Sequence, residues 1–162
     1  MATFLRYYLP VFLWGAVIFL LSGSEFGSGW TVRWLEAILS AVYPEYAPAL
    51  VWKVNAVVRK LAHVTEYFVL GLLLWRALRR ESRPAGWRRS WALGTLGIGV
   101  VWASADETVQ LFQPGRVASV MDVGLDTLGV LVALLVIYGW SRWLGEGRET
   151  SGAKARPEDR SL

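Results

Sequence analysis

The side chains best suited to chemistry lie in one stretch of the chain, Asp106–Asp126, which reads DETVQLFQPGRVASVMDVGLD. Apolar runs flank it on both sides, Trp91–Ala105 before it and Leu128–Trp143 after it. Pro114 and Gly115 predict a turn, so the stretch is expected to end one helix and begin the next. Ionisable groups set into the ends of membrane spans are unfavourable unless they are paired or hydrated, and they therefore mark functional sites. The polar groups of the stretch are Asp106, Glu107, Gln110, Gln113, Arg116, Asp122 and Asp126.

A second polar group lies within the apolar run that ends at Trp75. Its members recur at helical spacing along one side of a helix: Arg59, Lys60, His63, Glu66 and Tyr67. Counted back from Arg76 at about 1.5 Å per residue, Glu66 lies roughly 15 Å deep, near the middle of a bilayer. A side chain at this depth does not face lipid, so the polar side is expected to face the other helices. We expect Glu66 to act there with His63, taking up a proton or a cation.

The composition is that of a membrane protein rather than of a soluble domain. Of 162 residues, 54% are hydrophobic and ten are Trp, and the mean hydropathy is positive. Several Trp and Tyr residues lie at the edges of apolar runs, as in the aromatic belts of membrane proteins. The absence of Cys excludes disulfides, thiolate metal ligands and cysteine nucleophiles. No nucleic-acid-binding motif is present, so the lipid bilayer is the partner that the sequence predicts.

The hydrophobic pattern predicts an all-α fold, an integral membrane bundle of four transmembrane helices with a short interfacial helix between the first two. The expected spans are Leu9–Leu21, a second that starts around Val51–Ala56 and runs to Trp75, Trp91–Phe112 and Ser119–Trp143. The expected interfacial helix is Thr31–Val42. A secretory signal peptide is the competing interpretation of the first span. A transmembrane helix is favoured because the apolar run continues from Tyr7 and is long enough for a tilted span. Residues 1–144 would form the transmembrane domain, and residues 145–162 a disordered polar tail.

The basic residues predict how the helices are oriented in the membrane. Six of the 17 lie in the loop Arg76–Arg89, which carries one acidic residue, Glu81. A short loop this basic belongs on the cytoplasmic side, and four spans then place both termini in the cytoplasm. In this topology twelve basic residues lie inside and five outside. The start of the second span, the end of the third and the start of the fourth therefore meet at the outer leaflet, where their polar groups would line an outward-facing cleft.

The charge balance of this cleft indicates a need for positive charge. Its acidic residues are Glu66, Asp106, Glu107, Asp122 and Asp126, and its basic residues are Arg59, Lys60 and Arg116. Such a cluster must hold extra protons, stay hydrated or bind a cation. Carboxylate, amide and water ligands would favour Mg²⁺, Ca²⁺ or Mn²⁺, although the sequence assigns no metal ligands, and one His without Cys argues against a usual zinc site. The simpler alternative is structural: Asp106 and Glu107 pair with Arg116, and His63 is a packing residue.

Two segments resemble the VanZ-like family of small bacterial integral membrane proteins: RKLAHVTEYFVLG at Arg59–Gly71 and ASADETVQLFQPGRVASVMDVGLDTLG at Ala103–Gly129. The resemblance extends over residues 55–140. The residues that match the family's motifs are Lys60, His63, Glu66, Tyr67, Asp106, Glu107, Gln110, Arg116, Asp122 and Asp126. Arg59 stands where some relatives have an acid. The resemblance implies a link to antibiotic resistance, namely low-level resistance to teicoplanin, a lipoglycopeptide that acts on cell-wall precursors outside the membrane.

Two classes of function fit these residues. In the first, the outward-facing cleft binds a lipid headgroup, a lipid-linked cell-wall precursor or a glycopeptide at the cell envelope. The ligand-binding residues would be Arg59, Lys60, Tyr67, Gln110, Arg116, Asp122 and Asp126, of which the basic ones suit a phosphate. In the second, the protein is an intramembrane enzyme that modifies an outer-leaflet envelope lipid. The candidate catalytic residues would then be His63, Glu66, Asp106 and Glu107. The sequence identifies no nucleophile, which favours binding over catalysis.

Overall fold

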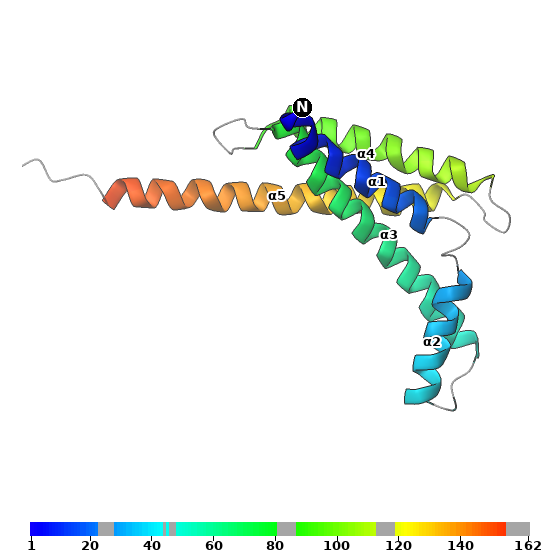
Figure 1. Ribbon diagram of the computed structural model, residues 1–162. Coiled ribbons are helices and arrows are strands. Elements are labelled where there is room, and N and C mark those ends of the chain that lie inside the picture. The colour runs from blue at the N-terminus through cyan, green and yellow to red at the C-terminus, as the bar shows by residue number, and fades with distance from the viewer. Residues whose placement is uncertain (23–27, 44, 46–47, 81–86, 113–118, 155–162) are drawn as a thin grey trace, which may run out of the picture.

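The computed structural model describes residues 1–22, 28–43, 45, 48–80, 87–112 and 119–154. These residues are almost wholly helical and include no strand (Figure 1). The elements are η1 (Phe4–Tyr8), α1 (Leu9–Leu21), α2 (Ser28–Val42), α3 (Pro48–Arg79), α4 (Arg89–Gln110) and α5 (Val120–Lys154). The all-α fold that the sequence predicts is confirmed.

Among the described residues, three helices are long and apolar enough to cross a membrane: Phe4–Leu21, α3, and α5 from Val120 to Leu144. They correspond to the first, second and fourth expected spans. α4 covers the third expected span but is not one of the three, because its glycines and its hydroxyl and acidic residues lower its hydropathy. A fourth span therefore stays a prediction. α2 corresponds to the expected interfacial helix, and its location at the membrane surface likewise stays a prediction.

α3 is the helix on which the others assemble, since it contacts η1, α1, α2, α4 and α5. In Figure 1 its carboxyl-terminal half lies against α1, α4 and α5, whereas its amino-terminal half runs with α2 away from them. The fully buried side chains come from α1, α3, α4 and α5 and include Ile18, Tyr67, Leu70, Ala103 and Val130. The core of the bundle therefore surrounds the carboxyl-terminal half of α3.

Glycines let α3 and α5 touch backbone to backbone. A Cβ atom added to Gly129 of α5 would lie 2.4 Å from the carbonyl oxygen of Val64 and 3.0 Å from the amide nitrogen of Phe68. A Cβ atom added to Gly71 of α3 would lie 2.9 Å from Cβ of Ala133. Small residues allow such close contact between helices in membrane bundles. These contacts therefore fix the position of α5 along α3.

Aromatic and arginine side chains gather where α3 ends and α4 begins. The ring of Trp75 stacks on that of Trp87 with centroids 5.0 Å apart, and Trp87 meets Tyr138 of α5 edge-on at 5.1 Å. Arg80 Nε donates a 2.7 Å hydrogen bond to the hydroxyl of Tyr8, and Figure 1 shows the N-terminus at this same end. A belt of aromatic and basic residues is typical of a membrane interface. Which side of the membrane this end faces stays a prediction.

α5 extends well beyond the bundle (Figure 1). It is helical to Lys154, so it covers residues 145–154 of the segment that the sequence predicts as a polar tail. Residues 155–162 lie outside the described residues, as does the turn expected at Pro114 and Gly115. The division into a transmembrane domain and a disordered tail stays a prediction.

Candidate functional site

Three polar side chains from three helices meet inside the bundle: His63 of α3, Asp106 of α4 and Asp126 of α5. One ligand-type atom from each lies within 4.8 Å of the other two. His63 Nδ1 and Asp126 Oδ1 are 3.3 Å apart, and Asp106 and Asp126 are each 1% exposed. We refer to these three residues as the His-Asp-Asp cluster. For them, the convergence of polar groups from three helices that the sequence predicts is present in the structure.

The close packing of α3 and α5 brings the cluster together. Gly129 lies against the backbone of α3, and His63 and Asp126 face each other about one turn before that contact on their respective helices. α4 packs on α5 next to this contact. A Cβ atom on Gly99 would lie 2.8 Å from the side chain of Val130, the residue that follows Gly129. Asp106 follows Gly99 by two turns and so lies on the same face of α4. Small residues at the helix contacts thus determine where the polar residues meet.

Asp106 is oriented through one of its two carboxylate oxygens. Its Oδ2 accepts a hydrogen bond from Ser22 Oγ at 2.9 Å and another from Gln110 Nε2 at 3.2 Å. The contact with Gln110 follows from a spacing of four along α4. No local sequence pattern marks Ser22 as a site residue, because its partner lies 84 residues away in the chain. Ser22 is therefore a site residue that only the tertiary structure identifies.

Two further contacts fix α1 beside the cluster. Trp14 Nε1 donates a 2.9 Å hydrogen bond to the backbone carbonyl of Glu66. Trp102 of α4 packs on Gly15, where an added Cβ atom would lie only 1.9 Å from the indole ring. The side chain of Glu66 is half-buried, and among the described residues its carboxylate makes no hydrogen bond to the cluster. Glu66 is therefore a neighbour of the cluster rather than a member of it.

Several buried polar atoms at the cluster have no hydrogen-bond partner in the described part of the chain: His63 Nδ1, Tyr67 Oη, Asp106 Oδ1 and Asp126 Oδ1. Tyr67 follows His63 by one turn of α3 and is fully buried. The contact between His63 and Asp126 brings the two groups close without hydrogen-bond geometry. Unpaired polar atoms in an apolar setting are unfavourable. The cluster is therefore suited to a ligand that supplies the missing partners.

Glu107 and Asp122 lie where α4 ends and α5 begins. Glu107 Oε1 accepts a hydrogen bond from the backbone N–H of Ser119, and Ser119 Oγ accepts one from the N–H of Met121 at 3.2 Å. Asp122 lies partly buried in the first turn of α5. Acidic groups at a helix N-terminus are favourable, so both side chains have a structural use here. Arg116, which the structural alternative pairs with Glu107, lies outside the described residues.

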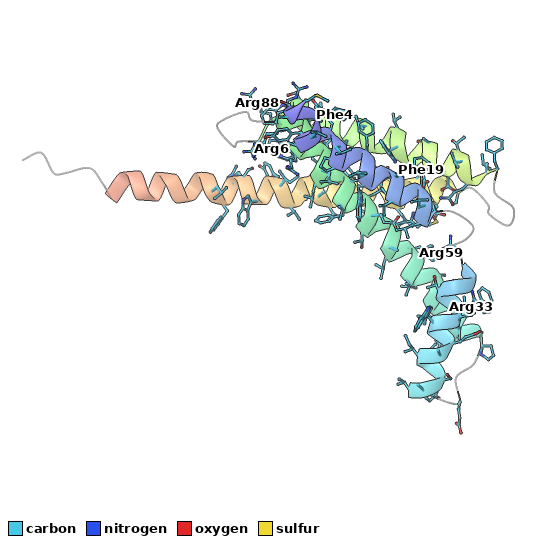
Figure 2. All side chains as sticks on the ribbon, viewed as in Figure 1. Phe4, Arg6, Phe19, Arg33, Arg59 and Arg88 are labelled. Carbon is cyan, nitrogen blue, oxygen red and sulfur yellow. The ribbon has the colours of Figure 1, made fainter. Side chains whose placement is uncertain are left out.

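Arg59 and Lys60 do not join the cluster. Lys60 is exposed and Arg59 partly exposed, and neither forms an ion pair with an acid among the described residues. Figure 2 labels Arg59 on the part of α3 that runs toward α2. Both residues precede His63 by about one turn, but α3 leaves the bundle there. Their side chains thus lie at the edge of the site and are at least partly exposed at the surface of the protein.

These features define the class of protein, a helical membrane protein with a buried polar cluster. A family model described as VanZ/LLP1 matches residues 7–142. The chain therefore belongs to the VanZ/LLP1 family, and the family resemblance of its motifs is confirmed. No curated protein and no solved structure matched the chain.

Proposed function

We propose that this protein binds the phosphate-bearing headgroup of an envelope lipid or of a lipid-linked cell-wall precursor, at the outer face of the bacterial cytoplasmic membrane. The observation that supports this proposal is the His-Asp-Asp cluster, whose buried polar atoms lack partners within the described chain. The cluster lies toward the helix ends that the positive-inside rule assigns to the outer leaflet. Helices that only pack against one another do not need unpaired polar groups at this depth, where such groups are unfavourable.

Basic and acidic groups would contact different parts of the headgroup. Arg59 and Lys60 lie about one turn from His63 on α3, and their charges suit a phosphate. Arg116 would add a third positive charge. The carboxylates of the cluster accept hydrogen bonds, which suits the hydroxyl and amide groups of a sugar. A lipid-linked precursor offers phosphate and sugar side by side, and competition for it would explain the effect on teicoplanin susceptibility that the family resemblance implies.

Co-purification of lipid with the protein tests this proposal. The chain is extracted in mild detergent, and the bound lipid is identified by native mass spectrometry. We expect one phosphate-bearing species to be enriched over its share of the membrane, and to be lost in the double variant Arg59→Ala/Lys60→Ala. Lys53→Ala, which removes another exposed lysine of α3, is the matched control and should retain the lipid. Equal retention by both variants, or wild-type protein carrying only bulk lipid in membrane proportions, would contradict the proposal.

One observation favours the alternative, an intramembrane enzyme that modifies an outer-leaflet envelope lipid. His63 Nδ1 lies 3.3 Å from Asp126 Oδ1, and a carboxylate beside an imidazole suits general acid–base catalysis. Lipid analysis of cells with and without the gene separates the two functions. A new or missing lipid species supports the enzyme, whereas an unchanged lipid profile with altered teicoplanin susceptibility supports binding.

A further inference from the structure

The geometry of the His-Asp-Asp cluster points to a divalent metal site, and we propose that His63 Nδ1, Asp106 Oδ1 and Asp126 Oδ1 are its protein ligands. This inference rests on the cluster itself and not on the proposed binding of lipid, so the two proposals can fail separately.

The spacing of the atoms fits a single ion. In an octahedral site with bonds of about 2.2 Å, neighbouring ligand atoms lie roughly 3.1 Å apart and opposite ones roughly 4.4 Å. His63 Nδ1 and Asp126 Oδ1 are 3.3 Å apart, and the ligand-type atoms of the three residues lie within 4.8 Å of one another. The 3.3 Å contact lacks hydrogen-bond geometry, yet it matches two neighbouring ligands of one ion. Small side-chain movements would complete the coordination.

The atoms that would bind the ion are those that the chain leaves unpartnered. Asp106 uses Oδ2 to accept hydrogen bonds from Ser22 and Gln110, and its buried Oδ1 has no partner in the described chain. Asp126 Oδ1 and His63 Nδ1 lie 3.3 Å apart, and neither has a hydrogen-bond partner in the described chain. Metal ligands are typically oriented in this way, by hydrogen bonds from surrounding residues to the atom that does not bind the metal. Ser22 and Gln110 would be these orienting residues.

A dication would also balance the charge of the cluster. Two ionised carboxylates and a neutral imidazole carry two negative charges. Asp106 and Asp126 are each 1% exposed, and within the described residues the basic group in contact with them is His63, 3.3 Å from Asp126, with no Lys or Arg in an ion pair. Uncompensated charge is strongly unfavourable inside an apolar bundle. A divalent ion would remove this penalty at the place where the three helices meet.

The ligand types favour Mn²⁺. Carboxylates suit Mg²⁺, Ca²⁺ and Mn²⁺, and of these three Mn²⁺ is the transition metal, the class of ion that also accepts an imidazole nitrogen. Zn²⁺, bound by three protein ligands and a water, is the competing ion. Three protein ligands leave coordination positions open. A phosphate oxygen of a bound headgroup could occupy one of them, a step that rests on the proposed function.

Metal titration of the purified full chain in detergent tests the proposal. The protein is stripped with a chelator and titrated with Mn²⁺ alone, and bound ion is measured by electron paramagnetic resonance, with Zn²⁺ and Mg²⁺ as competitors. We expect saturation at about one ion per chain and a higher unfolding temperature with Mn²⁺. Asp126→Asn should abolish saturable binding. The control is Glu36→Gln, which removes an exposed acid of α2, and it should bind as wild type. Ser22→Ala should weaken binding by about 10–100-fold.

The outcomes distinguish a specific metal site from nonspecific binding of the ion and from misfolding of a variant. Size-exclusion chromatography shows whether each variant folds, and Ser22→Ala provides the comparison if Asp126→Asn does not. No saturable binding by folded wild-type protein would overturn the proposal, as would equal binding by Asp126→Asn and Glu36→Gln. Retention of lipid by protein that binds no metal would overturn the metal site alone. Metal binding without retained lipid would overturn only the proposed function.

Discussion

Replacing Gly129 by alanine should separate the two helices that assemble the site. The added Cβ would lie 2.4 Å from the carbonyl oxygen of Val64 and 3.0 Å from both the amide nitrogen of Phe68 and Cβ of Tyr67, whereas ordinary contact begins at 3.4 Å. The obstacles are backbone atoms and a Cβ atom, which no side-chain rotation removes. α3 and α5 must therefore move apart by about 1 Å, and His63 and Asp126, which lie beside this contact, would move with them.

The expected cost of this movement is at the upper end of the range for overpacking, about 3 kcal/mol. For a chain of this size each kcal/mol corresponds to roughly 2–4 °C, so the unfolding temperature should fall by about 6–12 °C. Thermal unfolding in detergent, followed by the fluorescence of the ten Trp residues, measures it. Metal and lipid retention should fall as well, because the spacing of the cluster is lost.

Gly124→Ala is the matched control on the same helix. A Cβ atom there would meet nothing within 4 Å, so the unfolding temperature should stay the same or rise slightly, since alanine favours helix. If Gly129→Ala unfolds at the temperature of Gly124→Ala, α3 and α5 do not pack backbone to backbone. The position assigned to the cluster would then be wrong.

The remaining predictions concern orientation and single contacts. Because the chain has no Cys, Lys60→Cys in intact cells should react with a membrane-impermeant maleimide and Arg88→Cys should not; the reverse pattern would place the site on the cytoplasmic side. Trp14→Phe removes the hydrogen bond to the carbonyl of Glu66 and should lower stability by about 1 kcal/mol in thermal unfolding, and an unchanged unfolding temperature would refute that contact. Glu66→Gln keeps size but removes charge; it should reduce lipid retention at matched abundance, and wild-type retention would leave Glu66 a packing residue. Arg116→Ala should accumulate normally and lose lipid, whereas reduced accumulation would indicate a structural partner of the acids.

The helices follow from the sequence because apolar runs and turn residues are local signals. α1 has the expected bounds, and α5 begins one residue after Ser119. α3 is longer at both ends than the expected span, because Pro48 is tolerated in the first turn of a helix and the arginines after Trp75 continue it. The hydrophobic pattern alone does not determine the number of membrane spans, since α4 combines glycines with buried acids.

The cluster could be predicted only in part. Spacing along each helix indicates that His63, Asp106 and Asp126 face the bundle, but the contact of Gly129 with α3 decides which of the polar residues meet. The same spacing groups Lys60 with His63, and it contains no information on where α3 leaves the bundle. Ser22 could not be found at all, because its hydrogen bond to Asp106 depends on how α1 packs.

In our proposal the His-Asp-Asp cluster binds a ligand rather than stabilising the bundle. Asp126→Asn tests it most directly, because it keeps the shape of the side chain and removes a buried charge. The measurement is the unfolding temperature of the ligand-free protein together with the amount of co-purified phosphate-bearing lipid, both compared with Glu36→Gln, which removes an exposed acid of α2. We predict that Asp126→Asn is at least as stable as wild type, since an unfavourable buried charge is gone, and that it loses the lipid. A destabilised Asp126→Asn variant that retains the lipid would contradict the account.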